Sequence, residues 1–117
     1  CVASADAARA ACDAAMKIDD TNRLADGLCL QGAASLKGAE YAEARRAIDR
    51  ARTLFMAAGN KYGLARLALL EAGLEAASGN RRAAEEALAE AAGYGERARM
   101  TGLVRAAEVM RENLPRP

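Results

Sequence analysis

The side chains of this sequence most able to do chemistry are its three cysteines, Cys1, Cys12 and Cys29. A group of carboxylates also has the types needed for an acid–base pair or a metal site, namely Glu85, Glu86 and Glu90. The 117-residue chain has no histidine, so it lacks both the usual general base near neutral pH and the commonest metal ligand. We therefore expect no enzymatic activity, no metal and no cofactor, and a structural role for the three glutamates.

Cys1 is the first residue, and the small polar stretch 2–6 follows it. In bacterial lipoproteins, signal cleavage leaves a lipid-modified cysteine at this position, often ahead of such a stretch. The start of the chain resembles that pattern, which implies a lipid anchor at Cys1 and a periplasmic or membrane-anchored location. The alternative is a chain cut at an arbitrary point, with a cytoplasmic location. A cysteine nucleophile using its own α-amino group is disfavoured, because such enzymes are built on sheets.

The composition predicts that helices position these side chains. Alanine fills 32 positions, whereas Val, Ile and Thr together fill 8, and aromatic residues make up 3% of the chain. Alanine has the highest helix propensity, and strands favour β-branched and aromatic residues. The sequence therefore predicts an all-α fold.

The distribution of charged residues excludes some classes of binding partner. The 17 basic and 16 acidic residues are mixed along the chain, so no basic surface for nucleic acid is expected. The longest charge-free run, residues 27–36, is too short for a transmembrane helix, so no membrane span is expected. Many charges are spaced as i, i+3 or i, i+4 pairs on solvated helix faces: Arg45 with Asp49, Glu43 with Arg46, Asp49 with Arg52, Arg81 with Glu85, and Arg82 with Glu86.

Breaks in the helical pattern come from Gly, Asn and Asp, at 19–22, 37–38, 59–60, 79–80 and 93–95. Between them, apolar residues recur at helical spacing. This pattern predicts six helices, approximately 3–18, 23–37, 40–58, 61–78, 80–93 and 96–113. The turns are short, so consecutive helices should pack antiparallel.

A 40-residue offset aligns the chain with itself. It pairs Leu24 with Leu64, Ala25 with Ala65, Leu30 with Leu70, Ala44 with Ala84, Ala47 with Ala87, Ile48 with Leu88, and Ala51 with Ala91. We therefore expect one domain over residues 1–117, in which two tandem hairpins, 23–58 and 61–93, lie between a leading helix, 3–18, and a capping helix, 96–113.

The hairpins place small and bulky residues in the order of a known repeat. In the first hairpin these residues are Gly32, Tyr41, Ala44, Ile48 and Ala51, and in the second they are Ala72, Ala84, Leu88 and Ala91. In this pattern the chain resembles the tetratricopeptide repeat, with the 40-residue spacing of its long-helix variants. The resemblance implies hairpins stacked as a short α-solenoid.

The resemblance also implies where a partner would bind, because the first helices of such repeats line an inner groove. Carried over by position, the groove residues are Asp26, Cys29, Ala33, Leu36, Arg66, Leu69, Gly73 and Ala76. Most are small or apolar, so the groove suits an amphipathic helix or an extended apolar segment of a partner protein. The alternative is that helix 96–113 covers the groove. The sequence predicts a non-enzymatic protein-binding module or, alternatively, a structural part of a larger solenoid or of a membrane-anchored lipoprotein assembly, and it leaves the oligomeric state open.

Cys12 and Cys29 lie at similar distances on either side of the predicted turn at 19–22. In an antiparallel hairpin they would lie at the same height, which allows a disulfide. Two free cysteines acting as small apolar side chains are the alternative. The groove position of Cys29 in the resemblance disfavours the disulfide.

Overall fold

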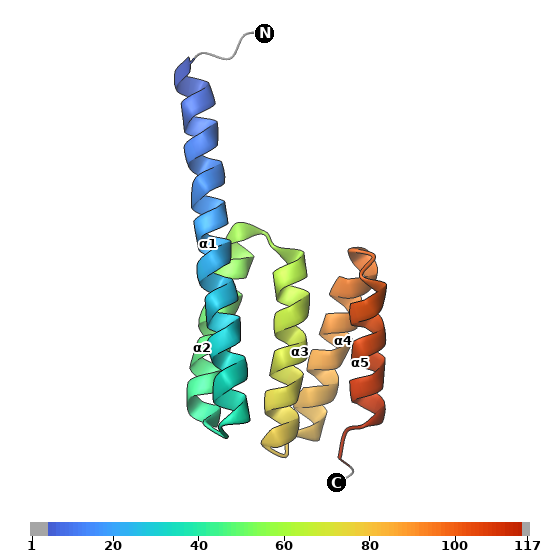
Figure 1. The fold of residues 1–117 in the computed structure, drawn as a ribbon. Coiled ribbons are helices and arrows are strands. Elements are labelled where there is room, and N and C mark those ends of the chain that lie inside the picture. Colours follow the sequence, from blue (N-terminus) through green and yellow to red (C-terminus); the bar gives the residue numbers. More distant parts are fainter. Residues whose placement is uncertain (1–4, 116–117) are drawn as a thin grey trace.

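The computed structural model describes residues 5–115 and consists there of five helices (Figure 1). Their bounds are α1 Ala5–Lys37, α2 Tyr41–Ala58, α3 Lys61–Ala77, α4 Arg81–Arg97 and α5 Thr101–Glu112. No strand occurs within the described range. The all-α prediction is therefore confirmed, whereas Cys1 and its predicted lipidation lie outside the described residues.

The first two predicted helices, 3–18 and 23–37, form the single helix α1, so the prediction of six helices was wrong. The segment 19–22 contains neither Gly nor Pro, and it stays helical. The Thr21 hydroxyl donates a hydrogen bond to the Lys17 carbonyl oxygen at 2.8 Å, which satisfies it inside the helix. The first half of α1 projects beyond the other helices (Figure 1), and residues 7–20 are all exposed.

Four reversals of the chain share one hydrogen-bond pattern. Left-handed backbone occurs every 20 residues, at Ala39, Gly59, Gly79 and Arg99, with φ of 59°, 65°, 82° and 57°. In each turn the next residue donates its N–H to the carbonyl oxygen five residues earlier, as from Glu40 to Ser35 at 2.8 Å and from Met100 to Gly95 at 2.7 Å. This is the Schellman pattern, which satisfies the last carbonyl groups of a helix. The predicted turn at 93–95 was wrong, because α4 continues to Arg97 and turns at 98–100.

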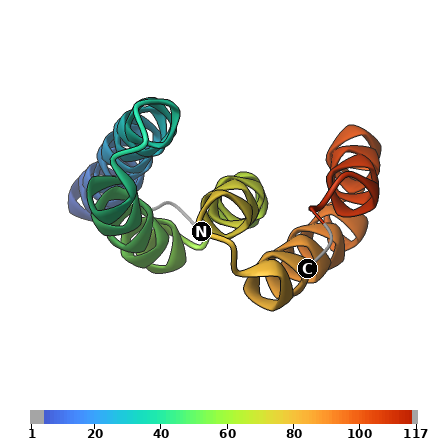
Figure 2. The same ribbon diagram turned by 90° about the horizontal axis from the view of Figure 1, so that it is seen from below.

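The helices pack in chain order, as α1 with α2, α2 with α3, α3 with α4, and α4 with α5. They form two layers, α1, α3 and α5 on one side and α2 and α4 on the other (Figure 2). The buried positions repeat at the predicted offset: Ala44 and Ala84, Ala51 and Ala91, and Ile48 and Leu88 are each at most 2% exposed. Alanine at these positions lets the helix axes approach closely.

The α2–α3 contact and the α4–α5 contact are equivalent in the 40-residue repeat. Each pairs a large residue with a glycine, but the two kinds of residue exchange helices. Between α2 and α3, the Phe55 ring fills the space beside Gly63, where a Cβ atom would overlap it. Forty residues later, between α4 and α5, Gly95 takes the place of Phe55 and Leu103 that of Gly63. A Cβ on Gly95 would lie 3.2 Å from Leu103 Cδ2 and 2.9 Å from Val104 Cγ2. At both contacts the large residue fills the space that the glycine leaves, so the two helices can pack closely.

Ion pairs connect α2 with α3 and α4. Arg45 pairs with Glu71 and with Glu75, and Arg52 pairs with Glu71 and, at 3.2 Å, with Glu90. The predicted pairs of Arg45 and Arg52 with Asp49 were wrong, because both guanidinium groups reach across to the next hairpin instead. The pairs of Arg46 with Glu43, Arg81 with Glu85 and Arg82 with Glu86 are present as predicted.

Candidate partner-binding face

The groove residues implied by the repeat resemblance lie on α1 and α3, on one side of the α1, α3 and α5 layer. We call this side the inner face; α3 is set back there between α1 and α5 (Figure 2). On α1 it comprises Asp26, Cys29, Ala33 and Leu36, and on α3 it comprises Arg66, Leu69, Gly73 and Ala76. Arg66 is exposed and the other seven are half-buried. The structure therefore brings the two predicted sets of residues together on neighbouring helices.

Two contacts join the sets. Arg66 donates to Asp26 Oδ1 at 2.9 Å, and both side chains are about half exposed, so this ion pair adds little to stability. At the other end of the face, a Cβ on Gly73 would lie 3.3 Å from Leu36 Cδ2. Leu36 thus packs over Gly73, and a larger residue at 73 would push against it. The inner face is bounded by a neutralised charge pair at one end and a close helix contact at the other.

Cys29 lies on the inner face of α1, and partial burial raises the pKa of its thiol. Cys29 does not form the disulfide with Cys12 that the sequence allowed and the repeat resemblance disfavoured. Both residues belong to the continuous helix α1 and are free. Seventeen residues of helix separate their Cα atoms by about 25 Å, far beyond the roughly 4–7 Å that a disulfide spans.

α5 leaves the α1 side of the inner face uncovered. It packs on α4 and touches the edge of α3, and within residues 5–115 it makes no contact with α1. Leu103 and Ala107, which a covering helix would turn toward the groove, are buried in the cluster shared with α4. Leu69 also packs against that cluster, so it has one side in the core and the other on the inner face.

Two exposed residues extend the inner face beyond the predicted set. Tyr62 lies one helical turn before Arg66 on α3 and is 56% exposed. Val109 on α5 stands 40 residues after Leu69 and is 47% exposed. Extending the groove pattern by one turn would have found Tyr62, and a third repeat of the 40-residue register would have found Val109.

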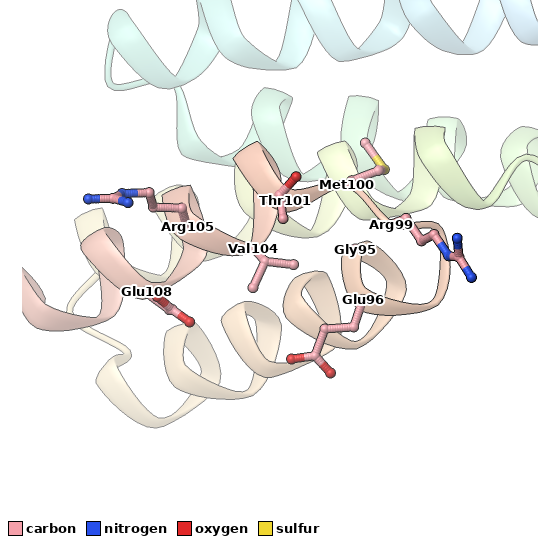
Figure 3. A pocket seen from close by; sticks show the side chains of 8 residues that line it. All are labelled: Gly95, Glu96, Arg99, Met100, Thr101, Val104, Arg105 and Glu108. Atoms are coloured by element: carbon pink, nitrogen blue, oxygen red, sulfur yellow. The ribbon is translucent and has the colours of Figure 1, made fainter.

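A hollow between the end of α4 and the start of α5 is a second candidate site (Figure 3). It is lined by Gly95, Glu96, Arg99, Met100, Thr101, Val104, Arg105 and Glu108.

The 40-residue repeat shows how the outer face of α5 differs from the matching face of α3. On α3 this face consists of Ala65, Ala68 and Ala72, which are buried against α4. On α5 the residues 40 positions later are Arg105, Glu108 and Glu112, which are all exposed. The outer face of α5 is therefore charged, as at the end of a helical array.

The carboxylates that suggested acid–base chemistry each contact an arginine. Glu85 pairs with Arg81 at 2.8 Å, Glu86 with Arg82 at 3.7 Å, and Glu90 with Arg52. Over the part of the chain that the structure describes, no group of three or more acidic or cysteine side chains is placed to hold a metal ion. None of the described helices contains a stretch long and apolar enough to cross a membrane.

No known protein family matches this chain, and neither a curated protein nor a solved structure matches it.

Proposed function

We propose that the protein is a non-enzymatic interaction module, resembling a short tetratricopeptide solenoid, that binds one segment of a partner protein on its inner face. The observation that carries the proposal is the free side of α3. Its Leu69, Gly73 and Ala76 are small or apolar and remain partly exposed, although α3 is packed on both flanks by α2 and α4. Such a side of a central helix offers apolar contact without the loss of any existing contact.

The residues on this face define the chemistry of the partner. Ala33 and Ala76 have small side chains, so the backbone of a bound segment can approach the inner face closely at these positions. Tyr62 supplies an amphipathic aromatic contact at one end. Arg66 is already neutralised by Asp26, so the face attracts no strong counter-charge. A partner segment with a narrow apolar stripe, helical or extended, fits best, and its affinity should vary weakly with salt.

Substitutions on the inner face test this function. Leu69→Asp should abolish partner binding, because an unpaired carboxylate facing apolar surface costs several kcal/mol. Leu69 also touches the core, so Tyr62→Asp provides a second variant at an exposed position. Arg82→Ala is the matched control, since the Arg82 side chain is 94% exposed on α4, away from this face. A photo-crosslinking amino acid in place of Tyr62 first identifies the partner. Binding of each variant is then measured by titration with that partner.

The expected result is loss of binding in Tyr62→Asp with unchanged helical circular dichroism, and normal binding in Arg82→Ala. If Tyr62→Asp and a folded Leu69→Asp both bind like the parent, the inner face is not the binding site.

A further inference from the structure

The outer face of α1, opposite its contacts with α2 and α3, carries large apolar residues that are exposed. Met16, Leu24 and Leu30 are 62%, 49% and 73% exposed. Forty residues later, the equivalents of Leu24 and Leu30 are Leu64 and Leu70, which pack in the cluster shared with α2. The side of α1 that is equivalent to the α2-facing side of α3 is therefore also apolar, but on α1 this side is exposed.

Gly27 is at the centre of this open face. A Cβ atom there would meet nothing within 4 Å. Glycine inside a helix costs about 1 kcal/mol relative to alanine, and packing within the chain gives no reason for it. At 100° per residue, Met16, Arg23, Gly27 and Leu30 fall within about 60° of one another around the α1 axis. The glycine thus forms a gap in a ridge of larger exposed side chains.

We propose that a second copy of this chain covers the outer face, with the two α1 helices antiparallel over residues 9–34 and a two-fold axis between residues 21 and 22. In this register Met16 of each copy enters the gap at Gly27 of the other, and Leu30 lies against Cys12. All four residues are exposed in the single chain. The shared length is about 39 Å of helix, and it uses residues 9–20 of α1, which are all exposed in the single chain.

Charges match in this register. Asp19 and Asp20 of each copy lie opposite Arg23 of the other, and Asp13 lies opposite Gln31. The two Arg23 side chains lie near the two-fold axis, about 4.5 Å apart along the helices, and each has Asp19 and Asp20 of the other copy beside it. Because the arrangement is two-fold, every favourable pair occurs twice.

Head-to-tail stacking of the two ends is disfavoured. It would place the exposed apolar face of α1 against Arg105, Glu108 and Glu112 on the outer face of α5. Those charges would lose water against the apolar side chains of Met16, Leu24 and Leu30, which is costly. The two-fold contact between α1 helices avoids this, and it keeps both inner faces free because they lie on another side of α1.

A charge-exchange series tests the dimer by sedimentation equilibrium over a concentration series. The parent should have the mass of two chains. Arg23→Asp should weaken association about tenfold or more, because three carboxylates then face each other. The triple variant Asp19→Arg, Asp20→Arg, Arg23→Asp should restore the dimer. Ala14→Arg is the matched control, since it adds charge on the projecting half of α1 about 160° around the helix axis from Met16, on the side opposite the outer face, and it should leave the dimer intact.

Crosslinking tests the register itself. In a Cys1→Ser background, oxidation of the Leu30→Cys variant by diamide should give a covalent dimer. A disulfide forms between Cys12 of one copy and the cysteine at position 30 of the other, and diamide takes up the two thiol hydrogens. Adding Cys12→Ser should abolish it. The two Cys12 residues would lie about 28 Å apart, so the background protein should not crosslink. A monomeric parent at all concentrations, full association of Arg23→Asp, or a Cys12-to-Cys12 crosslink in the background protein would each overturn the proposal.

Discussion

Single residues in the left-handed region form the four turns, and two of them are not glycine. Ala39 has φ 59° and is exposed, while Gly79 has φ 82° in the equivalent place one hairpin later. A side chain in this region costs about 1–2 kcal/mol, part of which is offset by the greater flexibility of glycine in the unfolded chain.

Reciprocal substitutions measure this cost. Ala39→Gly should raise the free energy of unfolding by about 0.5–1 kcal/mol, and Gly79→Ala should lower it by about 1 kcal/mol. Urea denaturation followed by circular dichroism compares the two variants. If both change stability in the same direction, left-handed strain does not govern the turns.

The two cysteines on α1 should differ in reactivity. Cys12 is exposed, whereas Cys29 is half-buried and burial raises the pKa of its thiol. The thiolate is the reactive form, so a raised pKa leaves less of it near neutral pH. At chain concentrations low enough to keep the proposed dimer dissociated, iodoacetamide should therefore alkylate Cys12 faster than Cys29 at pH 7, and the rate at Cys29 should rise as the pH increases toward its pKa. Mass spectrometry of timed samples gives both rates, and equal rates at pH 7 would contradict the expectation.

At the scale of elements, the junction between α2 and α3 depends on a large residue opposite a glycine. Phe55→Ala should cost about 3–5 kcal/mol, because it leaves a cavity beside Gly63. Gly63→Leu should also destabilise the chain, because the Phe55 ring occupies the space its Cβ needs.

The double variant Phe55→Ala, Gly63→Leu imitates the α4–α5 junction, where the smaller residue precedes the larger one. It should lose clearly less stability than the sum of the two single variants. Thermal melting of all three provides the comparison. Additive losses would show that the two positions do not share one packing volume.

For the whole molecule, an ion pair with a buried carboxylate connects the two hairpins. Glu75 on α3 is 7% exposed, pairs with Arg45 of α2, and accepts a hydrogen bond from Asn80 Nδ2 at 2.9 Å. Removing the arginine leaves a buried carboxylate without its cation.

Arg45→Met should therefore lower the free energy of unfolding by about 1–3 kcal/mol. The double variant Arg45→Met, Glu75→Gln should recover part of this loss, because no charge then stays buried. Arg46→Met is the control, since Arg46 is largely exposed and its ion pair with Glu43, at 4.0 Å, lies on the surface of the same helix. Chemical denaturation of the three variants tests this, and a control as destabilised as Arg45→Met would rule out the buried pair as the cause.

Much of the architecture follows from the sequence by itself. Helical spacing of apolar residues, abundant alanine and breaks at Gly-Asn pairs are short-range features, and they determine the all-α fold, the bounds of α2 and α3, and the 40-residue register of buried alanines. The inner-face residues could also be named in advance, because a residue's side of a helix depends on its spacing alone.

Only the tertiary structure decided the remaining features, because they depend on contacts between residues far apart in the chain. Arg45 and Arg52 have nearby aspartates in sequence, yet their carboxylate partners are on the next hairpin. Gly93 and Gly95 read as a turn, but α5 packs so close to Gly95 that a glycine is needed inside the helix. The segment 19–22 is compatible with either a turn or a helix. Residues 7–20 of α1 are all exposed, so within the described part of the chain no second helix packs back against them to favour the turn.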